Sequence, residues 1–361
     1  MDPLLSIYIP TYNSAHLLVR MLEALLPQTE PWGNKVEVIV SDNASDDNTQ
    51  ILLSEFAARF TLNYVRNDTN LGPIKNIVRG PSELARGEYV WVLGSHNLAN
   101  LGAIDYLIPL LERERERFKI FYVNFNCATY PQQWTEEATG GFRGEITYIA
   151  NQETADRVVE KWQELVKPET SLCTQMYAYI VKTSVWIDYW RDKTLGEPYT
   201  DAISTYPHSV MIADTLFKEP TYYIGTPLIT IYNGAQSWGD LDTRLKVYCI
   251  GLPDLIKLYR KNGLPASKNK QAQRWNQQMA KPIITSYFRE CSSSANQLVW
   301  TLVIKNLSRY YLLKTIWKGY LGARAQMPAK IIVRSQKLIG NLYRYFFFSW
   351  RPARWLRSKT E

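Results

Sequence analysis

Apolar runs alternate with amphipathic stretches through the first hundred residues of the chain. Four runs are short, apolar and rich in β-branched or aromatic residues, which is typical of buried strands: Leu5–Ile9, Val36–Val40, Leu62–Arg66 and Glu88–Leu93. Between them, apolar residues recur at helical spacing in Ser14–Leu26, in Thr49–Phe60 and around Ile74–Val78. This alternation predicts βαβ units, and hence an α/β fold with a mainly parallel sheet flanked by helices.

The middle of the chain continues the alternation at wider spacing. Ala103–Arg117 is predicted to form a helix whose ERERER run faces solvent, and Lys119–Asn124 returns to the sheet. Residues 151–231 mix helices with short strands such as Met176–Val181 and Tyr222–Ile224. From Asp240 onward the pattern is almost wholly helical. We therefore expect an α/β domain over residues 1–240 and a helical C-terminal region over residues 241–361.

Three polar clusters follow the predicted strands directly. They are Thr11-Tyr12-Asn13, Asp42–Asp47 and Ser95-His96-Asn97. Because ligands of open α/β sheets bind beyond the carboxyl ends of the strands, these clusters predict a binding site at one edge of the sheet.

Charge and cysteine content narrow the class of protein. The formal net charge is +8, but residues 301–361 carry 13 Lys/Arg against one acidic residue, so the first 300 residues carry 8 − 12 = −4. This division argues against nucleic-acid binding by the α/β domain. The four cysteines show no CxxC pair, so neither a disulfide framework nor a zinc site is expected. The N-terminus lacks the features of a secretory signal, and no apolar run reaches the ~18 residues of a membrane span.

Four motifs occur in order: SIYIPTYNSAHLL, VEVIVSDNASDDNT, NLGPIKNIVRG and ARGEYVWVLGSHNL. Their order and strand context closely resemble the nucleotide-sugar-binding region of family 2 glycosyltransferases, which have the GT-A fold, over about Leu5–Leu98. The resemblance continues more weakly to about Trp238, and it includes abequosyltransferase-like members. It implies a GT-A domain with a nucleotide-sugar half, residues 1–100, and an acceptor half, residues 101–240.

The resemblance also implies roles for individual residues. Asp42 would accept a hydrogen bond from a pyrimidine imide, and Lys75 would meet phosphate as a point charge. The full set expected to contact the donor is Pro10, Thr11, Tyr12, Asn13, Asp42, Asn43, Lys75, Asn76, Ser95, His96 and Trp238. Asp46 and Asp47 are instead interpreted as acidic residues at the N-terminus of the next helix.

The sequence departs from the family where a metal ion would bind. Family members carry an Asp-x-Asp or Asp-Asp-Asp motif where this chain has Ser95-His96-Asn97. Hard Mg²⁺ or Mn²⁺ prefers oxygen ligands, so a site here is expected to be weak. Three alternatives stay open: His96 and Asn97 bind a divalent cation, a cation such as Lys75 replaces the ion, or activity is lost.

A second departure concerns the general base. Inverting family members use an aspartate in a Glu-Asp pair, and Pro207-His208 falls at that position. His208 is a chemically sound base near neutral pH. Asp201 and Asp214 are the carboxylate alternatives nearby. Trp238 resembles an aromatic motif that closes some sugar-transferase sites, although core packing explains it equally well.

The C-terminal residues 329–361 combine basic and aromatic side chains on a predicted amphipathic helix. Such helices lie in membrane interfaces and are attracted to anionic headgroups; packing against the α/β domain or another subunit is the alternative. Together these features predict an inverting glycosyltransferase at the cytoplasmic face of the membrane. It would transfer a sugar from a nucleoside-diphosphate-sugar to a glycan acceptor, expected to be lipid-linked, in surface polysaccharide synthesis. The alternative is a catalytically degenerate homologue that acts as a scaffold, and an oligomer remains open.

Overall fold

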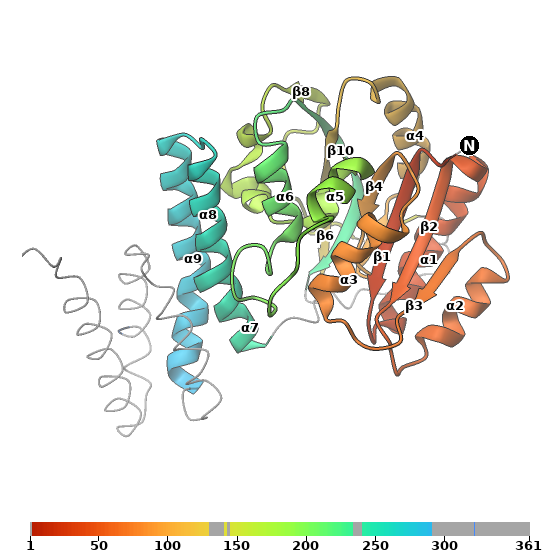
Figure 1. Cartoon of the computed structure of the whole chain (residues 1–361), viewed down its shortest axis with the longest axis horizontal. Coiled ribbons are helices and arrows are strands. Elements are labelled where there is room, and N and C mark those ends of the chain that lie inside the picture. The colour runs from red at the N-terminus through yellow and green to blue at the C-terminus, as the bar shows by residue number, and fades with distance from the viewer. Residues whose placement is uncertain (1, 130–140, 143–144, 234–239, 291–320, 322–361) are drawn as a thin grey trace, which may run out of the picture. The chain divides into compact units, whose positions relative to one another are not determined.

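The computed structural model describes residues 2–129, 141–142, 145–233, 240–290 and 321 (Figure 1). The chain divides into two compact units, Met1–Ser237 with Asp254–Ala272, and Trp238–Pro253 with Gln273–Glu361. The sheet and all of the described candidate site residues belong to the first unit.

A ten-stranded sheet forms the centre of the first unit. Its strands are β1 (Leu5–Thr11), β2 (Val36–Asp42), β3 (Asn63–Arg66), β4 (Tyr89–Val92), β5 (Asn97–Ala99), β6 (Ile120–Thr129), β7 (Tyr148–Ile149), β8 (Arg157–Val159), β9 (Tyr179–Lys182) and β10 (Thr221–Asn233). Their order is β3-β2-β1-β4-β9-β6-β10-β5, with β7 beside β6 and β8 beside β10. The α/β fold class predicted from the sequence is confirmed.

The direction of the strands is more mixed than the sequence predicted. Strands β3, β2, β1 and β4 are mutually parallel, and β6 is parallel to β10. Strand β9 lies antiparallel between β4 and β6, and β5, β7 and β8 are also antiparallel to their neighbours. Since β9 reverses direction, β4, β6 and β10 all end at the same edge as β1 and β2.

Helices of the first unit cover both faces of this sheet. The described helices are α1 (Ala15–Thr29), η1 (Glu30–Lys35), α2 (Thr49–Ala57), α3 (Pro73–Arg79), η2 (Gly80–Leu84), α4 (Ala103–Glu114), η4 (Trp162–Leu165), η5 (Pro168–Cys173), η6 (Met176–Ala178), α5 (Thr183–Trp190), α6 (Pro207–Thr215), α7 (Leu241–Lys246), η7 (Val247–Gly251), α8 (Leu252–Lys261) and α9 (Ala266–Glu290). Helix α1 packs against α2 and α4, whereas η2 packs against α5, and α5 against α6. Figure 1 shows α3, α5 and α6 on the near face of the sheet.

The hydrophobic spacing of the first helix is confirmed by its packing. Leu18, Met21, Leu22 and Leu25 are fully buried on α1, and β1 is buried along nearly its whole length. Each such side chain contributes about 1.5–3 kcal/mol by leaving water. Ser14 precedes α1 as predicted, but its hydroxyl bonds the Thr11 hydroxyl at 2.8 Å rather than capping the helix.

Strand β10 is much longer than the three residues predicted for it. Gly225 and Pro227 interrupt the apolar pattern, and the pairing with β6 shifts register between Ile224 and Ile229. A Cβ atom on Gly225 would lie 2.4 Å from the backbone carbon of Thr154, so only glycine fits at this irregular point. The strand resumes beyond the interruption and carries its end to the edge of the sheet where β1 and β2 also end.

Helix α3 lies directly on β1 because its next residue is a glycine. A Cβ atom on Gly80 would lie 2.0 Å from Cζ of Tyr8, whose ring is fully buried. The Tyr8 hydroxyl donates to the backbone oxygen of Asn76 at 2.6 Å, which fixes the helix over the strand.

Candidate functional site

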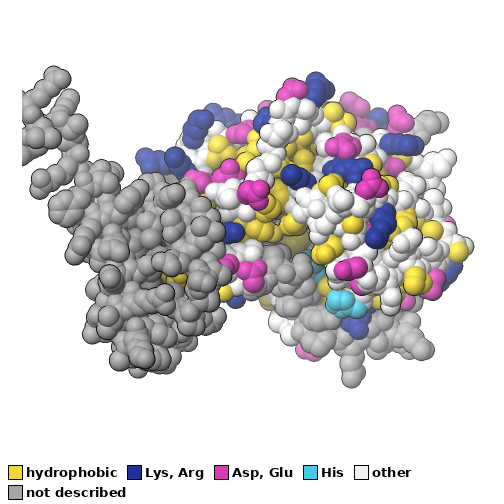
Figure 2. Space-filling view, turned by 60° about the horizontal axis from the view of Figure 1, so that its bottom comes forward, with side chains coloured by type: hydrophobic (Ala, Val, Ile, Leu, Met, Phe, Trp, Pro, Cys, Tyr) yellow, Lys and Arg dark blue, Asp and Glu magenta, His cyan; other side chains and the backbone are white. Residues whose placement is uncertain are grey.

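The predicted polar clusters come together at the carboxyl edge of the parallel strands. Thr11 pairs with Asp42 in the register of β1 and β2, and the Leu93 amide donates to the backbone oxygen of Tyr8 at 2.9 Å. The residues that follow β1, β2 and β4 therefore share one edge. Figure 2 is turned so that this lower edge of Figure 1 comes forward, and acidic and basic side chains alternate on its described part.

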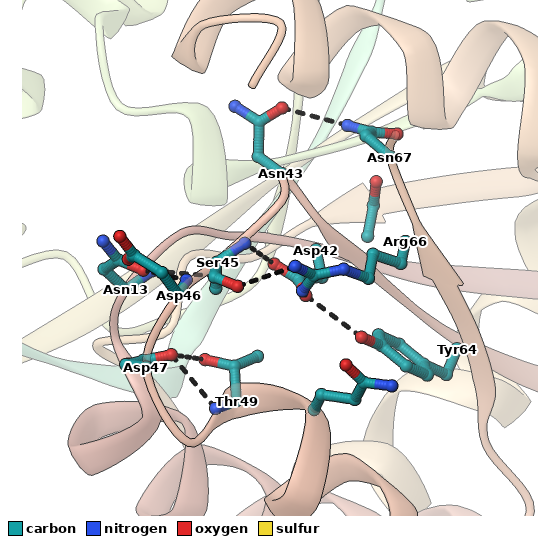
Figure 3. A network of polar contacts seen from close by, with 12 residues as sticks. Asn13, Asp42, Asn43, Ser45, Asp46, Asp47, Thr49, Tyr64, Arg66 and Asn67 are labelled. Carbon is teal, nitrogen blue, oxygen red and sulfur yellow. Dashed lines mark hydrogen bonds and ion pairs between the residues drawn. The ribbon is translucent and has the colours of Figure 1, made fainter. Parts of the chain in front are cut away.

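Asp42 is the most enclosed polar group of this edge, with a fully buried carboxylate (Figure 3). Its Oδ1 accepts from the Ser45 amide at 2.8 Å. Its Oδ2 accepts from the Tyr64 hydroxyl at 3.0 Å and from Nη1 of Arg66 at 2.5 Å. The Arg66 side chain is 37% exposed, so the guanidinium covers the carboxylate on the solvent side.

Tyr64 and Arg66 were missed by the sequence analysis, although a signal for them exists. They stand two residues apart on β3 and hence on one face of the strand. In the parallel register, Arg66 pairs with Asp42 itself. Burial raises the pKa of Tyr64, and the neighbouring Asp42 carboxylate adds to this shift. Tyr64 is therefore a neutral donor to Asp42 at neutral pH.

The loop after β2 is fixed by Asn13 and Asp47. Asn13 adopts a left-handed φ of 47°, its amide donates to the Ser45 hydroxyl, and its Oδ1 accepts from the Asp46 amide, both at 2.9 Å. The Asp47 carboxylate accepts from the amides of Ala15 and Thr49, each at 3.0 Å. Burial alone would raise the pKa of Asp47, but these bonds and the Thr49 hydroxyl outweigh it and lower the pKa. Asp47 thus accepts hydrogen bonds at the N-terminus of α2, as predicted, and also at the N-terminus of α1, which was not predicted.

Asn43 and Asn76 are internal rather than open to a ligand, each being 2% exposed. The Asn76 side chain accepts from the Ser41 hydroxyl at 2.8 Å and from Asn67 at 3.0 Å. The Asn43 Oδ1 accepts from Asn67 at 3.0 Å and from the Leu71 amide at 2.9 Å. These buried side-chain amides join the NLGPIKN segment to the end of β2, and so they hold the loops of this edge in place.

Only some members of the predicted donor set are exposed to solvent. Tyr12 is 45% exposed, and Lys75 is exposed on the first turn of α3. Thr11 is buried, and Pro10 is half-buried. Trp238 lies outside the described residues. Tyr12, Asn13 and Lys75 are therefore the exposed side chains of the donor set, which a ligand can reach directly.

The loop after β4 does not fit a Mg²⁺ or Mn²⁺ site. The Asn97 Oδ1 accepts from the Gly94 amide at 2.6 Å, which closes the turn and uses the one oxygen of a fully buried side chain. His96 and Ser95 are half-buried, and burial lowers the pKa of His96 to about 4. Within the described ranges, no three His, Cys, Asp or Glu residues are arranged to hold a metal ion. A site of His96 and Asn97 would thus lack any carboxylate, so the geometry gives no support to these two residues as metal ligands.

The two catalytic candidates occupy different environments. His208 lies in the first turn of α6, is 5% exposed, and its Nε2 bonds the backbone oxygen of Thr174 at 3.1 Å. Burial lowers the pKa of His208 to about 4. Asp201 is exposed in the preceding loop, where its Oδ1 accepts from the Ser204 amide at 2.8 Å. Asp214 accepts from the Tyr189 hydroxyl at 2.7 Å.

A sheet of this order, with polar loops at the carboxyl edge of its parallel half, defines a GT-A-type α/β domain. The model of the family described as glycosyl transferase family 2 matches residues 6–165. Residues 6–165 of the chain are therefore similar to family 2 glycosyltransferases. The crystal structure of Staphylococcus aureus TarS 1–349 in complex with UDP has the same fold, with a TM-score of 0.51 at 13% identity, covering 96% of this chain and 92% of that one.

Curated relatives match the same amino-terminal part. Abequosyltransferase RfbV of Salmonella typhimurium is 38% identical over 115 residues, which cover 31% of this chain and 34% of the relative. The uncharacterized glycosyltransferase MG060 homolog of Mycoplasma pneumoniae is 30% identical over 140 residues, which cover 36% and 46%. The chain thus spans a third to a half of the length of these two relatives. Among the described helices, none is long and apolar enough to cross a membrane.

Proposed function

We propose that the protein transfers a sugar from a nucleoside-diphosphate-sugar to a glycan acceptor during bacterial surface polysaccharide synthesis. The observation that carries the proposal is the buried Asp42 carboxylate with Arg66 at the carboxyl edge of a domain similar to family 2 glycosyltransferases. The edge of a nucleotide base offers both hydrogen-bond donors and acceptors. The Asp42 carboxylate can accept from such a donor, and the Arg66 guanidinium can donate to such an acceptor. The activity of the abequosyltransferase relative supports the same class of reaction.

The exposed side chains would contact the donor directly: the Tyr12 ring would lie beside the base, and Lys75 would meet the diphosphate. The half-exposed Arg66 covers the buried Asp42 carboxylate, so Asp42 would read the base once the guanidinium moves aside. Pro10, Thr11 and Asn13 would line the ribose side. Asn43 and Asn76 act by holding this surface, since both are buried and hydrogen-bonded within the protein.

The reaction would proceed with inversion. An acceptor hydroxyl attacks the anomeric carbon, its proton passes to a base, and the bond from the anomeric carbon to the nucleoside diphosphate breaks. We assign the base to Asp201, because its carboxylate is exposed at the start of the segment that leads into α6. The diphosphate that leaves would be met by Lys75 and by hydrogen-bond donors of the Gly94–Asn97 loop, so that a divalent cation is of minor importance.

Donor turnover with and without metal tests this proposal. We expect UDP-, GDP-, CDP- or dTDP-sugar turnover by the full chain to change by less than about threefold between EDTA and Mn²⁺, since the loop offers no carboxylate. The readout is released nucleotide, with Mn²⁺ binding followed by electron paramagnetic resonance. The variant S95D/N97D, which restores two carboxylates, serves as the matched control and should bind Mn²⁺ more tightly.

Two results would oppose the proposal in different ways. Activity that EDTA abolishes and Mn²⁺ restores would show that the cation is needed. Nucleotide binding without turnover of any donor would favour the degenerate homologue that serves as a scaffold, for which the replaced carboxylates are the supporting observation.

The acceptor is proposed to be lipid-linked and reached at the cytoplasmic face of the membrane. The support is the basic, aromatic sequence of residues 329–361, which lie outside the described residues. Each Lys or Arg near an anionic surface contributes about 1 kcal/mol. The full chain should therefore float with vesicles that contain the anionic lipid phosphatidylglycerol, and deletion of residues 329–361 should abolish flotation. Binding that persists after the deletion would refute this role, and RNA in place of vesicles is the polyanion control.

A further inference from the structure

A strained turn lies at the end of η5, five residues before β9. Ser171, Leu172 and Cys173 have φ values of 49°, 54° and 62°, so three successive residues with a Cβ adopt the left-handed conformation. Leu172 and Cys173 are buried. Non-glycine residues rarely adopt this conformation even singly, and such strain persists only where the surrounding structure enforces it.

Three side chains from two helices enforce this turn. The Tyr259 hydroxyl of α8 donates to the Leu172 carbonyl at 3.1 Å, and the Ser209 hydroxyl of α6 donates to the Cys173 carbonyl at 2.9 Å. Nε2 of His208 bonds the Thr174 carbonyl at 3.1 Å, a contact that requires the ring to donate. Three consecutive carbonyls are thus each held by a different, buried side chain.

The turn leads straight to the edge of the sheet that carries the site. Beyond it, Tyr177 accepts from Nε1 of Trp91 at 2.7 Å through its backbone oxygen. Trp91 belongs to β4, which continues into the Gly94–Asn97 loop, and β9 pairs with β4 from Tyr89↔Lys182 to Trp91↔Ile180. The segment that follows the turn therefore packs on β4, the strand that leads into the loop in place of the family's Asp-x-Asp motif.

We propose that His208 is a positioning residue, which donates from Nε2 to the Thr174 carbonyl and thereby holds the left-handed turn as a wall of the acceptor half. This inference rests on the proposed function, and it replaces the role of general base predicted for His208. A ring whose Nε2 proton is committed to a carbonyl, and whose Nδ1 is buried without a partner, is poorly placed to take a proton from a bound hydroxyl. Its low pKa is consistent with this role.

Two substitutions separate positioning from proton transfer. In His208→Gln the amide nitrogen can occupy the place of Nε2 and still donate to Thr174, whereas in His208→Asn it falls short. Neither side chain can act as a base. We expect H208Q to keep turnover within about threefold of wild type with an unchanged pH profile. H208N should raise the KM for the glycan acceptor about tenfold, with little change in donor KM. The reason is that a displaced turn would weaken acceptor binding.

Hydrogen exchange provides a readout that does not depend on turnover. Amides of the turn, such as Leu172, which donates to Lys167 at 3.0 Å, should exchange at least about tenfold faster in H208N and at the wild-type rate in H208Q. Ser209→Ala should shift exchange in the same direction as H208N, and Tyr259→Phe provides a further variant should H208N fail to fold. Thr215→Val is the control, since that hydroxyl bonds the Met211 carbonyl within α6 itself.

The possible results separate this inference from the proposed function. Losses of at least about 100-fold in both H208Q and H208N would identify His208 as the base and overturn the positioning role. Exchange that is equal in all variants would overturn it as well. A wild-type protein without turnover would refute the proposed function, whereas the exchange result would still decide whether His208 holds the turn.

Discussion

Replacing Asp201 with asparagine is expected to lower kcat by at least about 100-fold while donor affinity stays within about twofold of wild type. General bases contribute roughly 10²–10⁴-fold to such reactions, and an amide cannot accept the proton. Asparagine keeps an oxygen that can accept from the Ser204 amide, as the Asp201 Oδ1 does at 2.8 Å, so the loop should keep its shape. Released nucleotide reports kcat, and calorimetric titration reports donor affinity.

The neighbouring carboxylates provide the controls for this prediction. Asp192 is exposed in the same connection between α5 and α6, and Asp192→Asn should leave kcat unchanged. Asp214 is engaged by the Tyr189 hydroxyl at 2.7 Å and should matter for stability rather than for proton transfer. A loss of activity in D214N with full activity in D201N would move the base to Asp214. Full activity in both would require a base other than these two carboxylates.

The sequence predicted which polar clusters lie at the edge of the sheet, because the signals for this placement are local. Each polar cluster directly follows an apolar run, so Asp42 and Asn13 could be placed at the sheet edge without knowledge of tertiary contacts. The sequence could not separate residues that contact a ligand from residues that hold the site in shape. Lys75 and Asn76 are neighbours on α3 and look equally suitable in the sequence, yet Lys75 faces solvent and Asn76 points inward to Ser41.

The surroundings of His208 could not be predicted from the sequence, because long-range contacts decide them. His208 has the residue type and sequence position of a base, and only the folded chain brings Thr174 within 3.1 Å of its Nε2. Similarly, β10 is interrupted in sequence by Gly225 and Pro227, and its pairing with β6 carries it past the irregularity. The left-handed turn at Ser171–Cys173 has no glycine to mark it. Its conformation follows from the helices that hold it, so local propensity gave no signal.

Asp42→Ala is expected to raise the dissociation constant for the preferred nucleoside diphosphate about 30- to 100-fold. Hydrogen bonds to charged groups contribute about 1.5–3 kcal/mol, and a loss of 2–2.7 kcal/mol corresponds to that range of affinity. The variant also removes the common partner of Ser45, Tyr64 and Arg66, so the base edge loses both its acceptor and the guanidinium that Asp42 holds in place. Calorimetric titration with UDP, GDP, CDP and dTDP measures the change.

Asp46→Ala is the matched control for this change, because Asp46 lies four residues along the same loop and is exposed. Its backbone amide, which the substitution retains, makes the contact to Asn13. We expect D46A to bind nucleotide within about twofold of wild type, since an exposed charge at this distance is screened. A thermal melt of D42A separates local loss of the base site from unfolding. If D42A bound as tightly as D46A while remaining folded, the base would have to be recognised elsewhere, and the carboxylate under Arg66 would then serve only to join β2 to β3.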